Sequence, residues 1–505
     1  MVGYTADEVF LQSLARRSFL RFWSWPNLFR DQGHATRGGD GKEICDLVII
    51  FGDDILLFSD KRISFPSGKD VRVAWSRWAR KAIAASAKQV HGARRWLQSY
   101  PDRVFLDEKC IERVPITLPR LDQVQFHSIV VCHGIEEELL AARREPSFGF
   151  DNSISRSRIW TPEECEPFVV GNVAEVEFVH VFNEKTVELV LKEFDTAKDF
   201  VSYLREREVI LTWPQPLRIE SESDIVQMYY ESFDEAEQRR SIATAEELTA
   251  GQKHIDKGGI ENLYQSRSFL LKKQADRVSY FWDDLIESFA FHILGGTAEH
   301  RTWQYPHEAE PALRLLAATS RFERRFLSES FLSFYDKALP GQRGTRLVLD
   351  PSDCAVGYLF FMLPYMDGRD YGEYRQVRRS MLEDYCMITK LDNPGLKCVI
   401  GLGAQTRRLD QSLTPEFFAE GQDFIVLDAA EWDDASRRHA EELKQSYIGN
   451  GLLASRARFE GKVSEFPEGG QGQRRTEPRR RAKGSERNKP CSCGSGVKAK
   501  KCCLR

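Results

Sequence analysis

Residues 41–61 read GKEICDLVIIFGDDILLFSDK, and this stretch decides the fold of the first part of the chain. It contains two apolar runs, 44–51 and 55–63, whose Val, Ile, Leu and Phe residues are typical of buried β-strands. The Gly-Asp-Asp sequence at 52–54 between the runs is a hairpin signal. The stretch therefore predicts a β-hairpin with charged residues at its open end.

The segments around the hairpin predict alternating helices and strands. A helix is expected at 7–20 before the hairpin, a long helix at 71–98 after it, and a further strand at 126–133. Apolar and small residues step by three and four along the long helix, which predicts one buried face. These residues are Trp75, Trp78, Ala82, Ser86, Val90, Ala93 and Leu97. The order helix, hairpin, helix, strand predicts an α/β domain over residues 1–180.

Two registers of the hairpin are open. If residues 53–54 form a two-residue loop, Asp46 lies directly opposite Lys61 on one face. A three-residue loop instead brings Asp46 opposite Asp60. A carboxylate and an ammonium group at the open end could bind a divalent cation and activate water for phosphodiester cleavage. The second interpretation is an ion pair that caps a purely structural hairpin.

This order of elements resembles the PD-(D/E)XK nuclease superfamily, which has the restriction-endonuclease-like fold. Its members carry a helix, an Asp on one strand, (Asp/Glu)-x-Lys on the next strand, and a further helix. The resemblance implies that Asp46 and Lys61 are catalytic, that Mg²⁺ is the cofactor and that nucleic acid is the substrate. The superfamily often has a supporting Gln or Lys on the following helix, where Gln89 and Lys88 stand, although a solvated helix face is expected for both.

The sequence departs from the superfamily pattern at Ser59, which stands two residues before Lys61 where an acid is expected. Asp60 is acidic, but in a regular strand its side chain points to the other face. Glu43, or Glu8 on the first helix, could replace the missing carboxylate, and a β-bulge could turn Asp60 inward. The candidate catalytic residues are Asp46, Lys61, Glu43 and Asp60.

The last nineteen residues, 487–505, read RNKPCSCGSGVKAKKCCLR. Two cysteine pairs separated by eight residues suit tetrahedral Zn²⁺, and so short a segment would take its folding free energy from the metal. The segment resembles the SEC-C motif, a zinc-binding segment also found at the C-terminus of the SecA preprotein translocase. The resemblance implies a small zinc knuckle whose ligands are Cys491, Cys493, Cys502 and Cys503.

Composition and charge narrow the class of protein. Hydrophobic residues make up 42 % and charged residues 29 % of the chain, which is typical of globular proteins. No apolar run reaches the roughly 18 residues of a membrane helix, and the N-terminus lacks a signal peptide, so a cytoplasmic protein is expected. Residues 471–505 contain twelve Lys or Arg and two Glu, a net charge of +10, so the preceding 470 residues carry −14. This pattern predicts an acidic body with one cationic arm.

The rest of the chain is expected to form four further segments. Residues 181–340 form a mostly helical domain with helices at 196–208, 223–249, 266–294 and 311–337. Residues 341–450 form a mixed α/β region with strands at 345–349, 397–401 and 423–427 and a helix at 374–388. Residues 451–486 form a basic, disordered linker before the zinc knuckle at 487–505. The acidic residues Asp283, Asp284 and Glu287 are expected on a solvated helix face.

Two functions follow from these features. The first is a Mg²⁺-dependent nuclease that acts on nucleic acid, in genome defence by analogy with nuclease domains fused to helical domains. The second is a non-enzymatic adaptor whose nuclease-like domain is inactive and whose zinc tail docks a protein partner. The sequence indicates neither the substrate nor the oligomeric state.

Overall fold

The structure is a computed structural model. It describes residues 5–31, 41–120, 122–155, 159–173, 177–234, 239–243, 247, 259–298, 303–339, 341–365, 370–406, 422–428, 432–453 and 464–467. These residues form a mixed α/β structure with several sheets and many helices. Within the described residues, none of the helices combines the length and the hydrophobicity that crossing a bilayer requires.

A five-stranded sheet with the order β1-β4-β5-β6-β9 forms the centre of the first part of the chain. Its strands are β1 (Ser24–Pro26), β4 (Leu47–Phe51), β5 (Asp54–Arg62), β6 (Gln125–His133) and β9 (Val179–Asn183). β4 runs antiparallel to both of its neighbours, whereas β5, β6 and β9 are parallel to one another. The predicted hairpin and the predicted strand at 126–133 are confirmed.

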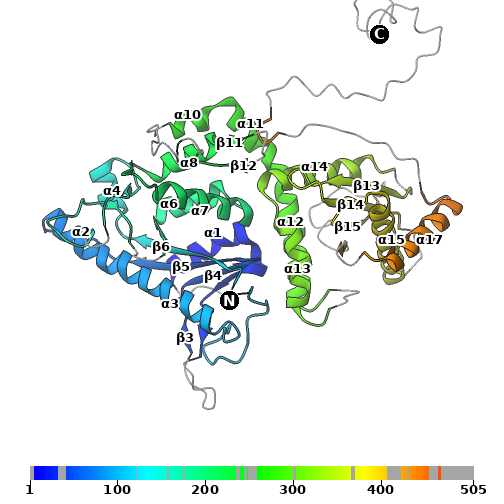
Figure 1. Cartoon of the computed structure of the whole chain (residues 1–505), viewed down its shortest axis with the longest axis horizontal. Helices are drawn as coiled ribbons and strands as arrows, with labels where there is room; N and C mark the ends of the chain where they lie inside the picture. Colours follow the sequence, from blue (N-terminus) through cyan, green and yellow to red (C-terminus); the bar gives the residue numbers. More distant parts are fainter. Residues whose placement is uncertain are drawn as a thin grey trace, which may run out of the picture.

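Helices cover both faces of this sheet, as Figure 1 shows. On one face, α1 (Ala6–Trp23) packs against β4, β5 and α6 (Glu184–Glu193). On the other face, α3 (Ala85–Ser99) packs against β5 and β6. Apolar side chains on both faces of β4 and β5 are buried by these helices, which explains why the two runs show no polar alternation.

The predicted long helix is confirmed as α2 (Val71–Ala79), a π-helical turn (Arg80–Ala84) and α3 in succession. All seven residues of its predicted apolar stripe are buried. The predicted helix at 7–20 is α1, whose N-terminus has a capping box between Thr5 and Glu8. The cap holds Glu8 in the first turn of α1.

The middle of the chain is mostly helical, as predicted. Its helices are α7 (Ala197–Leu211), α8 (Glu222–Glu231), α10 (Ile260–Gln265), α11 (Arg267–Asp276), the 3₁₀ turn η2 (Arg277–Ser279), α12 (Tyr280–Leu294), α13 (Pro306–Ala317) and α14 (Arg321–Lys337). The predicted helix at 223–249 is wrong beyond α8, because the chain turns back into the short pair β11 (Phe233–Asp234) and β12 (Arg239–Arg240). This turn brings the Arg240 guanidinium over the rings of Tyr229, Tyr230 and Phe233, a tertiary contact that helix propensity does not report.

A second sheet with the order β13-β14-β15-β16 forms the third part of the chain. Its strands are β13 (Gly344–Leu349), β14 (Val356–Leu363), β15 (Cys398–Gln405) and β16 (Asp423–Asp428). α15 (Tyr371–Asp392) connects the parallel strands β14 and β15, and α17 (Asp434–Gly449) packs on α15. The three predicted strands and the helix at 374–388 are confirmed, whereas β14 and α17 were not predicted.

Smaller elements complete the first part. β2 (Phe29–Arg30) pairs with β3 (Lys42–Glu43), and a three-stranded sheet has the order β10 (Arg218–Ile219), β7 (Gly149–Asp151), β8 (Val169–Val170). α4 (Glu136–Arg143) follows β6. One hydrophobic core runs through the first sheet, the middle helices and one face of the second sheet. β9 crosses residue 180, the expected end of the first domain, so the division into domains stays a prediction.

Candidate active site at the open end of the hairpin

Four carboxylates gather where β4 begins and β5 ends. Glu43 lies in β3, Asp46 directly precedes β4, Asp60 lies in β5, and Glu8 lies in the first turn of α1. The charges of Asp46 and Glu8 both act on Glu43, and those of Asp60 and Glu8 both act on Asp46. The structure therefore brings the candidate residues Glu43 and Asp46 together with Glu8 at one edge of the sheet, whereas the side chain of Asp60 contacts His133.

The register of the hairpin differs from both predicted registers. The two-residue turn lies at 52–53, and its register, carried on to the residue before β4, puts Asp46 beside Ser59. The expected positions of Asp46 opposite Lys61 or opposite Asp60 are therefore wrong. Compared with the predicted loop at 53–54, the turn begins one residue earlier, which shifts the residue opposite Asp46 by two, from Lys61 to Ser59.

Two contacts of Asp54 explain this register. Its Oδ1 lies 2.8 Å from Nε2 of His127 on β6 and 2.7 Å from Nη2 of Arg205 on α7. These partners hold Asp54 within β5, so it cannot be part of the turn. Gly52 takes the left-handed turn position, with φ of +60°, which only glycine adopts at no steric cost.

Asp46 is held by two neighbours on β5. Its Oδ2 accepts a hydrogen bond of 2.5 Å from the backbone N–H of Asp60, and the Ser59 hydroxyl lowers the pKa of Asp46 by hydrogen bonding. The Ser59 hydroxyl also lies 3.2 Å from Oε1 of Gln89 on α3. Ser59 is buried and Gln89 is half-buried, so Gln89 is not on a solvated helix face. Lys88, by contrast, is exposed as expected.

Negative charge is poorly compensated among these acids. Burial, with the nearby charges of Asp46 and Glu8, raises the pKa of Glu43 to about 7. Burial and the charges of Asp60 and Glu8 also raise the pKa of Asp46 to about 6, against the hydrogen bonds that lower it. Within the described part of the chain, neither Glu43 nor Asp46 forms an ion pair with a Lys or Arg side chain. This combination of half-buried, neighbouring acids favours a bound cation.

Asp60 points away from this group. The register of β5 with β6 is unbroken from residue 54 to residue 62, so the described strand has no bulge that would turn Asp60 inward. The Asp60 side chain is fully buried, and its Oδ1 lies 2.5 Å from Nε2 of His133 on β6. His133 Nδ1 in turn lies 3.1 Å from Oε2 of Glu184, and Arg62 lies 3.2 Å from the same oxygen. Asp60 therefore belongs to an ionic network on the opposite face from Ser59.

Three potential metal ligands near the ends of β6 and β9 were not predicted from the sequence: His133, Glu136 and Glu184. One potential metal-ligating atom from each lies within 4.8 Å of those of the other two. His133 ends β6, and Glu184 directly follows β9, so both stand at the carboxyl ends of parallel strands. That position is the signal that could have identified them, since the carboxyl ends of parallel strands are where α/β sheets commonly bind ligands.

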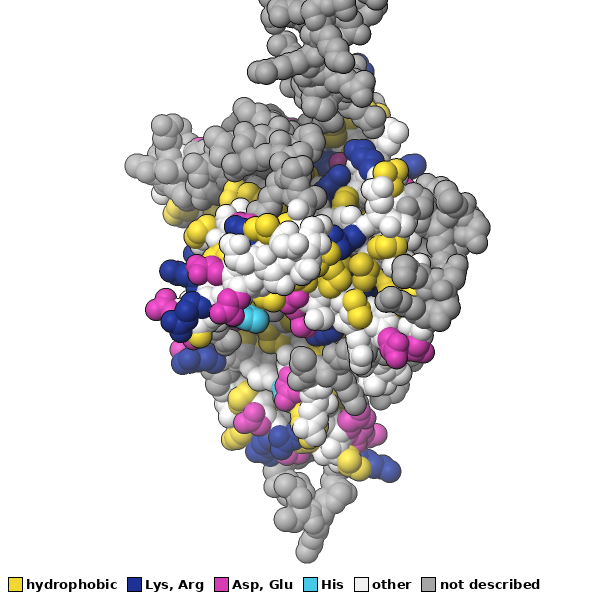
Figure 2. Space-filling view, turned by 90° about the vertical axis from the view of Figure 1, so that its right-hand side faces the viewer, with side chains coloured by type: hydrophobic (Ala, Val, Ile, Leu, Met, Phe, Trp, Pro, Cys, Tyr) yellow, Lys and Arg dark blue, Asp and Glu magenta, His cyan; other side chains and the backbone are white. Residues whose placement is uncertain are grey.

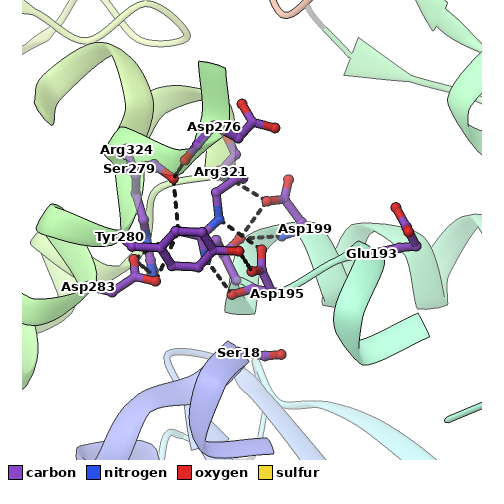
Figure 3. A network of polar contacts seen from close by, with 12 residues as sticks. Ser18, Glu193, Asp195, Asp199, Asp276, Ser279, Tyr280, Asp283, Arg321 and Arg324 are labelled. Carbon is purple, nitrogen blue, oxygen red and sulfur yellow. Dashed lines mark hydrogen bonds and ion pairs between the residues drawn. The ribbon is translucent and has the colours of Figure 1, made fainter. Parts of the chain in front are cut away.

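A second polar network lies between the first part and the middle helices, and Figure 3 shows it with Tyr280 and Arg321 at its centre. Arg321 Nε lies 2.8 Å from Oδ1 of Asp195, and its Nη1 lies 2.9 Å from Oδ2 of Asp283. Arg324 pairs with the other oxygen of Asp283 at 2.7 Å, and the Tyr280 hydroxyl donates to Asp195 at 2.7 Å. The charges are matched within the protein, so we assign this network a structural role.

The same network corrects one prediction. Asp283 was expected on a solvated helix face, but it is buried between Arg321 and Arg324. Glu287, from the same predicted face, accepts a hydrogen bond of 2.5 Å from the backbone N–H of Arg21. Composition alone suggested solvent exposure, because the two arginines lie about forty residues further along the chain.

One face of the molecule shows how charge is distributed on the surface. Figure 2 shows the face on the side of β13 to β16, where Lys and Arg side chains are interspersed with Asp and Glu side chains. On the described surface in this view, basic side chains do not gather into one broad patch. The described residues of this face therefore do not form the continuous positive patch that binds a nucleic-acid backbone.

The comparisons with known proteins concern the C-terminal segment. Residues 487–505 match the family model of the SEC-C motif, so the chain carries a SEC-C motif at this position. The four cysteines of the predicted zinc knuckle fall in this segment, which lies outside the described residues. No curated protein and no solved structure matches the chain.

Proposed function

We propose that the first part of the chain is a metal-dependent phosphodiesterase with a restriction-endonuclease-like fold that cleaves nucleic acid. One observation carries the proposal. Glu8, Glu43 and Asp46 lie together at the open end of the hairpin, and Lys61 stands near the end of β5. The order α1, β4, β5, α3 and β6 agrees with the order that the superfamily resemblance requires. A cytoplasmic location and a role in genome defence are part of this proposal.

The residues present fit a divalent cation. Asp46 and Glu43 would hold it, with Glu8 near both. Burial and neighbouring negative charges raise the pKa of both carboxyls, and neither carboxyl forms an ion pair with a described Lys or Arg side chain. When bound, Mg²⁺ would supply charge neutralisation at the scissile phosphate and lower the pKa of a bound water. In this proposal Glu43 supplies the carboxylate that the superfamily pattern expects at position 59, where this chain has a serine.

Lys61 has a separate role in the proposal. It lies two residues beyond Ser59 on the same strand, so the two side chains share a face of β5. Lys61 is half-buried, and no described carboxylate forms an ion pair with it. Its ammonium group is thus available to offset charge on a phosphate and to position the attacking water. Gln89 supports this face through Ser59.

A cleavage assay tests the proposal. Full-length protein is incubated with Mg²⁺ or Mn²⁺ and with single- or double-stranded DNA and RNA, beside the variants Asp46→Asn, Glu43→Gln and Lys61→Met. We expect cleavage that each substitution lowers by about 10²-fold or more. Asp53→Asn is the matched control, because Asp53 is an exposed acid in the turn at the other end of the hairpin. Cleavage that survives all three substitutions, or no cleavage of any substrate, would refute the proposal.

We propose that the SEC-C motif binds one Zn²⁺ through Cys491, Cys493, Cys502 and Cys503. The support is the match to the motif together with the donor set, since four thiolates are the usual ligands of a closed structural zinc site. Elemental analysis should find about one zinc per chain, and Cys502→Ser with Cys503→Ser should remove it. Zinc that remains in this double variant would contradict the assignment.

A second candidate function is the adaptor, in which the hairpin domain is inactive and the zinc tail docks a protein. The observation that favours it is that Ser59 replaces the usual acid while Asp60, the neighbouring acid, is buried against His133. The adaptor predicts no cleavage with any metal, and capture of a protein by the wild-type chain but not by the double cysteine variant. The nuclease predicts the opposite result in the cleavage assay.

A further inference from the structure

Residues 464–467, far along the chain, lie against the middle helices. Arg325 Nη2 on α14 donates to the carbonyl of Ser464 at 2.7 Å and to that of Glu465 at 3.1 Å. Phe466 packs against the main hydrophobic core. A disordered linker was expected over 451–486, but Ser464, Glu465 and Phe466 have specific partners in the body.

Glu465 enters a cationic socket. Both of its carboxylate oxygens lie 2.7 Å from Nη2 of Arg240, and Oε1 lies 3.5 Å from Nζ of Lys272. The exposed fractions of the three side chains are 12 % for Glu465, 9 % for Arg240 and 6 % for Lys272. The contact is thus a nearly dry ion pair, where removing one partner leaves an uncompensated buried charge.

The body positions Arg240 without help from the segment. The guanidinium lies 5.0 Å from the ring centre of Tyr229 and 5.2 Å from that of Tyr230. Its Nη1 also donates to the backbone carbonyls of both tyrosines, at 3.0 and 2.9 Å. Nη2 is therefore left for the carboxylate, while the rest of the guanidinium is held by residues outside the segment.

The charges of the socket are complementary to an acidic residue. Asp276 is shared by Lys272, at 2.6 Å, and Arg325, at 2.9 Å. Arg240, Lys272 and Arg325 thus bring three positive charges to a site where Asp276 pairs with two of them, and the charge of Asp199 also acts on Lys272. Burial by itself would raise the pKa of Glu465, but Arg240 and Lys272 outweigh it and lower the pKa. A bound carboxylate reduces the remaining positive charge.

We propose that this socket, formed by Arg240, Lys272, Arg325 and the rings of Tyr229 and Tyr230, is a binding site for a short acidic–aromatic peptide. Its occupant is the chain's own Ser-Glu-Phe-Pro segment at 464–467. Ten residues, 454–463, connect this segment to the end of the third part, and the SEC-C motif follows it at 487–505. Binding in cis therefore attaches the motif-bearing end of the chain to the middle helices. The inference does not depend on nuclease activity.

Peptide binding to the full-length chain tests this proposal. The probe is a fluorescent synthetic peptide of residues 460–471, EGKVSEFPEGGQ, and the readout is fluorescence anisotropy. In the wild type the socket is filled by the tethered segment at a high effective concentration, so added peptide competes poorly. Glu465→Gln empties the socket by removing the charge at constant size. We expect this variant to bind the peptide at least tenfold more tightly than the wild type does.

Three controls make the test specific. Glu468→Gln removes the acidic charge three residues further along the chain and should behave as the wild type. Phe466→Ala weakens the binding of the segment by removing its packing against the core, so it should also empty the socket. This variant gives a second test if Glu465→Gln folds poorly. Adding Arg240→Met to either variant should abolish peptide binding.

The peptide itself supplies the last control. A peptide with Gln in place of Glu465 should bind the emptied socket at least tenfold more weakly. Equal binding of the probe to the wild type and to Glu465→Gln and Phe466→Ala, or no binding to either variant, would overturn the proposal. Equal binding of the Glu and Gln peptides would also overturn it.

Discussion

Asp60 Oδ1 and His133 Nε2 lie 2.5 Å apart, and both side chains are almost completely removed from solvent. The two residues stand on the neighbouring parallel strands β5 and β6. On its other side, His133 Nδ1 lies 3.1 Å from Glu184. An imidazole between two carboxylates is stabilised in its charged form. His133 therefore connects the edge of the first sheet to α6 as a buried cation.

The first prediction concerns the pH dependence of this contact. Burial by itself would lower the pKa of His133, but Asp60 and Glu184 outweigh it and raise the pKa to about 9. Because the pKa is higher in the folded state, the protonated imidazole stabilises the fold. This stabilisation is fully present below the unfolded pKa of about 6.5 and is lost as pH rises through about 9. The melting temperature should therefore fall more steeply between about pH 7 and pH 10 in the wild type than in His133→Gln. Parallel pH profiles of the two proteins would contradict this assignment.

The second prediction concerns Glu43 and Asp46, whose ionised carboxylates destabilise the folded protein near neutral pH. Their folded pKa values of about 7 and about 6 lie above the usual values, so stability is complete below about pH 4 and is lost as pH rises through the folded values. Asp46→Asn and Glu43→Gln should raise the melting temperature at about pH 8, by an amount equivalent to about 1–3 kcal/mol, and change it little at about pH 4.

The turn variant Asp53→Asn should show no such pH-dependent gain, because Asp53 is exposed. Added Mg²⁺ should stabilise the wild type at about pH 8 and lose this effect in Asp46→Asn. Destabilisation by both neutral substitutions at this pH would show that the carboxylates are already compensated in the folded protein.

The third prediction concerns the acid that the motif lacks. Ser59→Asp would place a carboxylate two residues before Lys61, next to Asp46 and on the face that packs against α3. If the proposed nuclease site is correct, Mg²⁺-dependent cleavage should rise about tenfold, because a further ligand strengthens the hold on the cation. Ser59→Asn, of the same size without the charge, should give no gain. Equal rates for the two folded variants would weigh against a cation at this position.

The fourth prediction concerns the network that holds the first part to the middle helices. Arg321→Met leaves Asp195 and Asp283 without one of their partners, and removing one member of a buried ion pair costs about 3–5 kcal/mol. Lys185→Met, in an exposed ion pair with Glu188, should cost less than about 0.5 kcal/mol. Thermal unfolding of both variants measures the contrast. Similar melting temperatures for the two would mean that the buried network contributes little.

Several elements could be predicted from sequence because their signal is local. The hairpin, β6 and the long helix all show a spacing or composition that burial imposes on neighbouring residues, and the seven-residue stripe of the long helix is buried throughout. β14 shows the limit of this signal. Tyr358 and Phe360 pack against Trp282 on α12, while Phe361 packs against Tyr385 on α15, so the strand has no polar face to reveal its period.

The candidate site could be predicted in part. Asp46 does lie near Glu43 and Glu8, the two residues that were offered as alternative sources of the missing carboxylate. The register at this site could not be predicted, because it depends on Asp54, whose partners His127 and Arg205 lie far along the chain. A one-residue difference in the turn moved Asp46 from Lys61 to Ser59. The contact between Asp60 and His133 likewise needed the pairing of β5 with β6.

By itself, the sequence determined that the first part of the chain contains a β-hairpin among helices and strands, that the middle is mostly helical and that residues 487–505 carry a SEC-C motif. These features depend on residues close together in the chain, whose spacing records which side chains are buried. Only the tertiary structure decided the hairpin register, the pairing of Asp60 with His133, and the binding of Glu465 to Arg240. Each of these contacts depends on charged side chains that are distant in sequence and come together only on folding. They pair because a buried charge without a partner is costly.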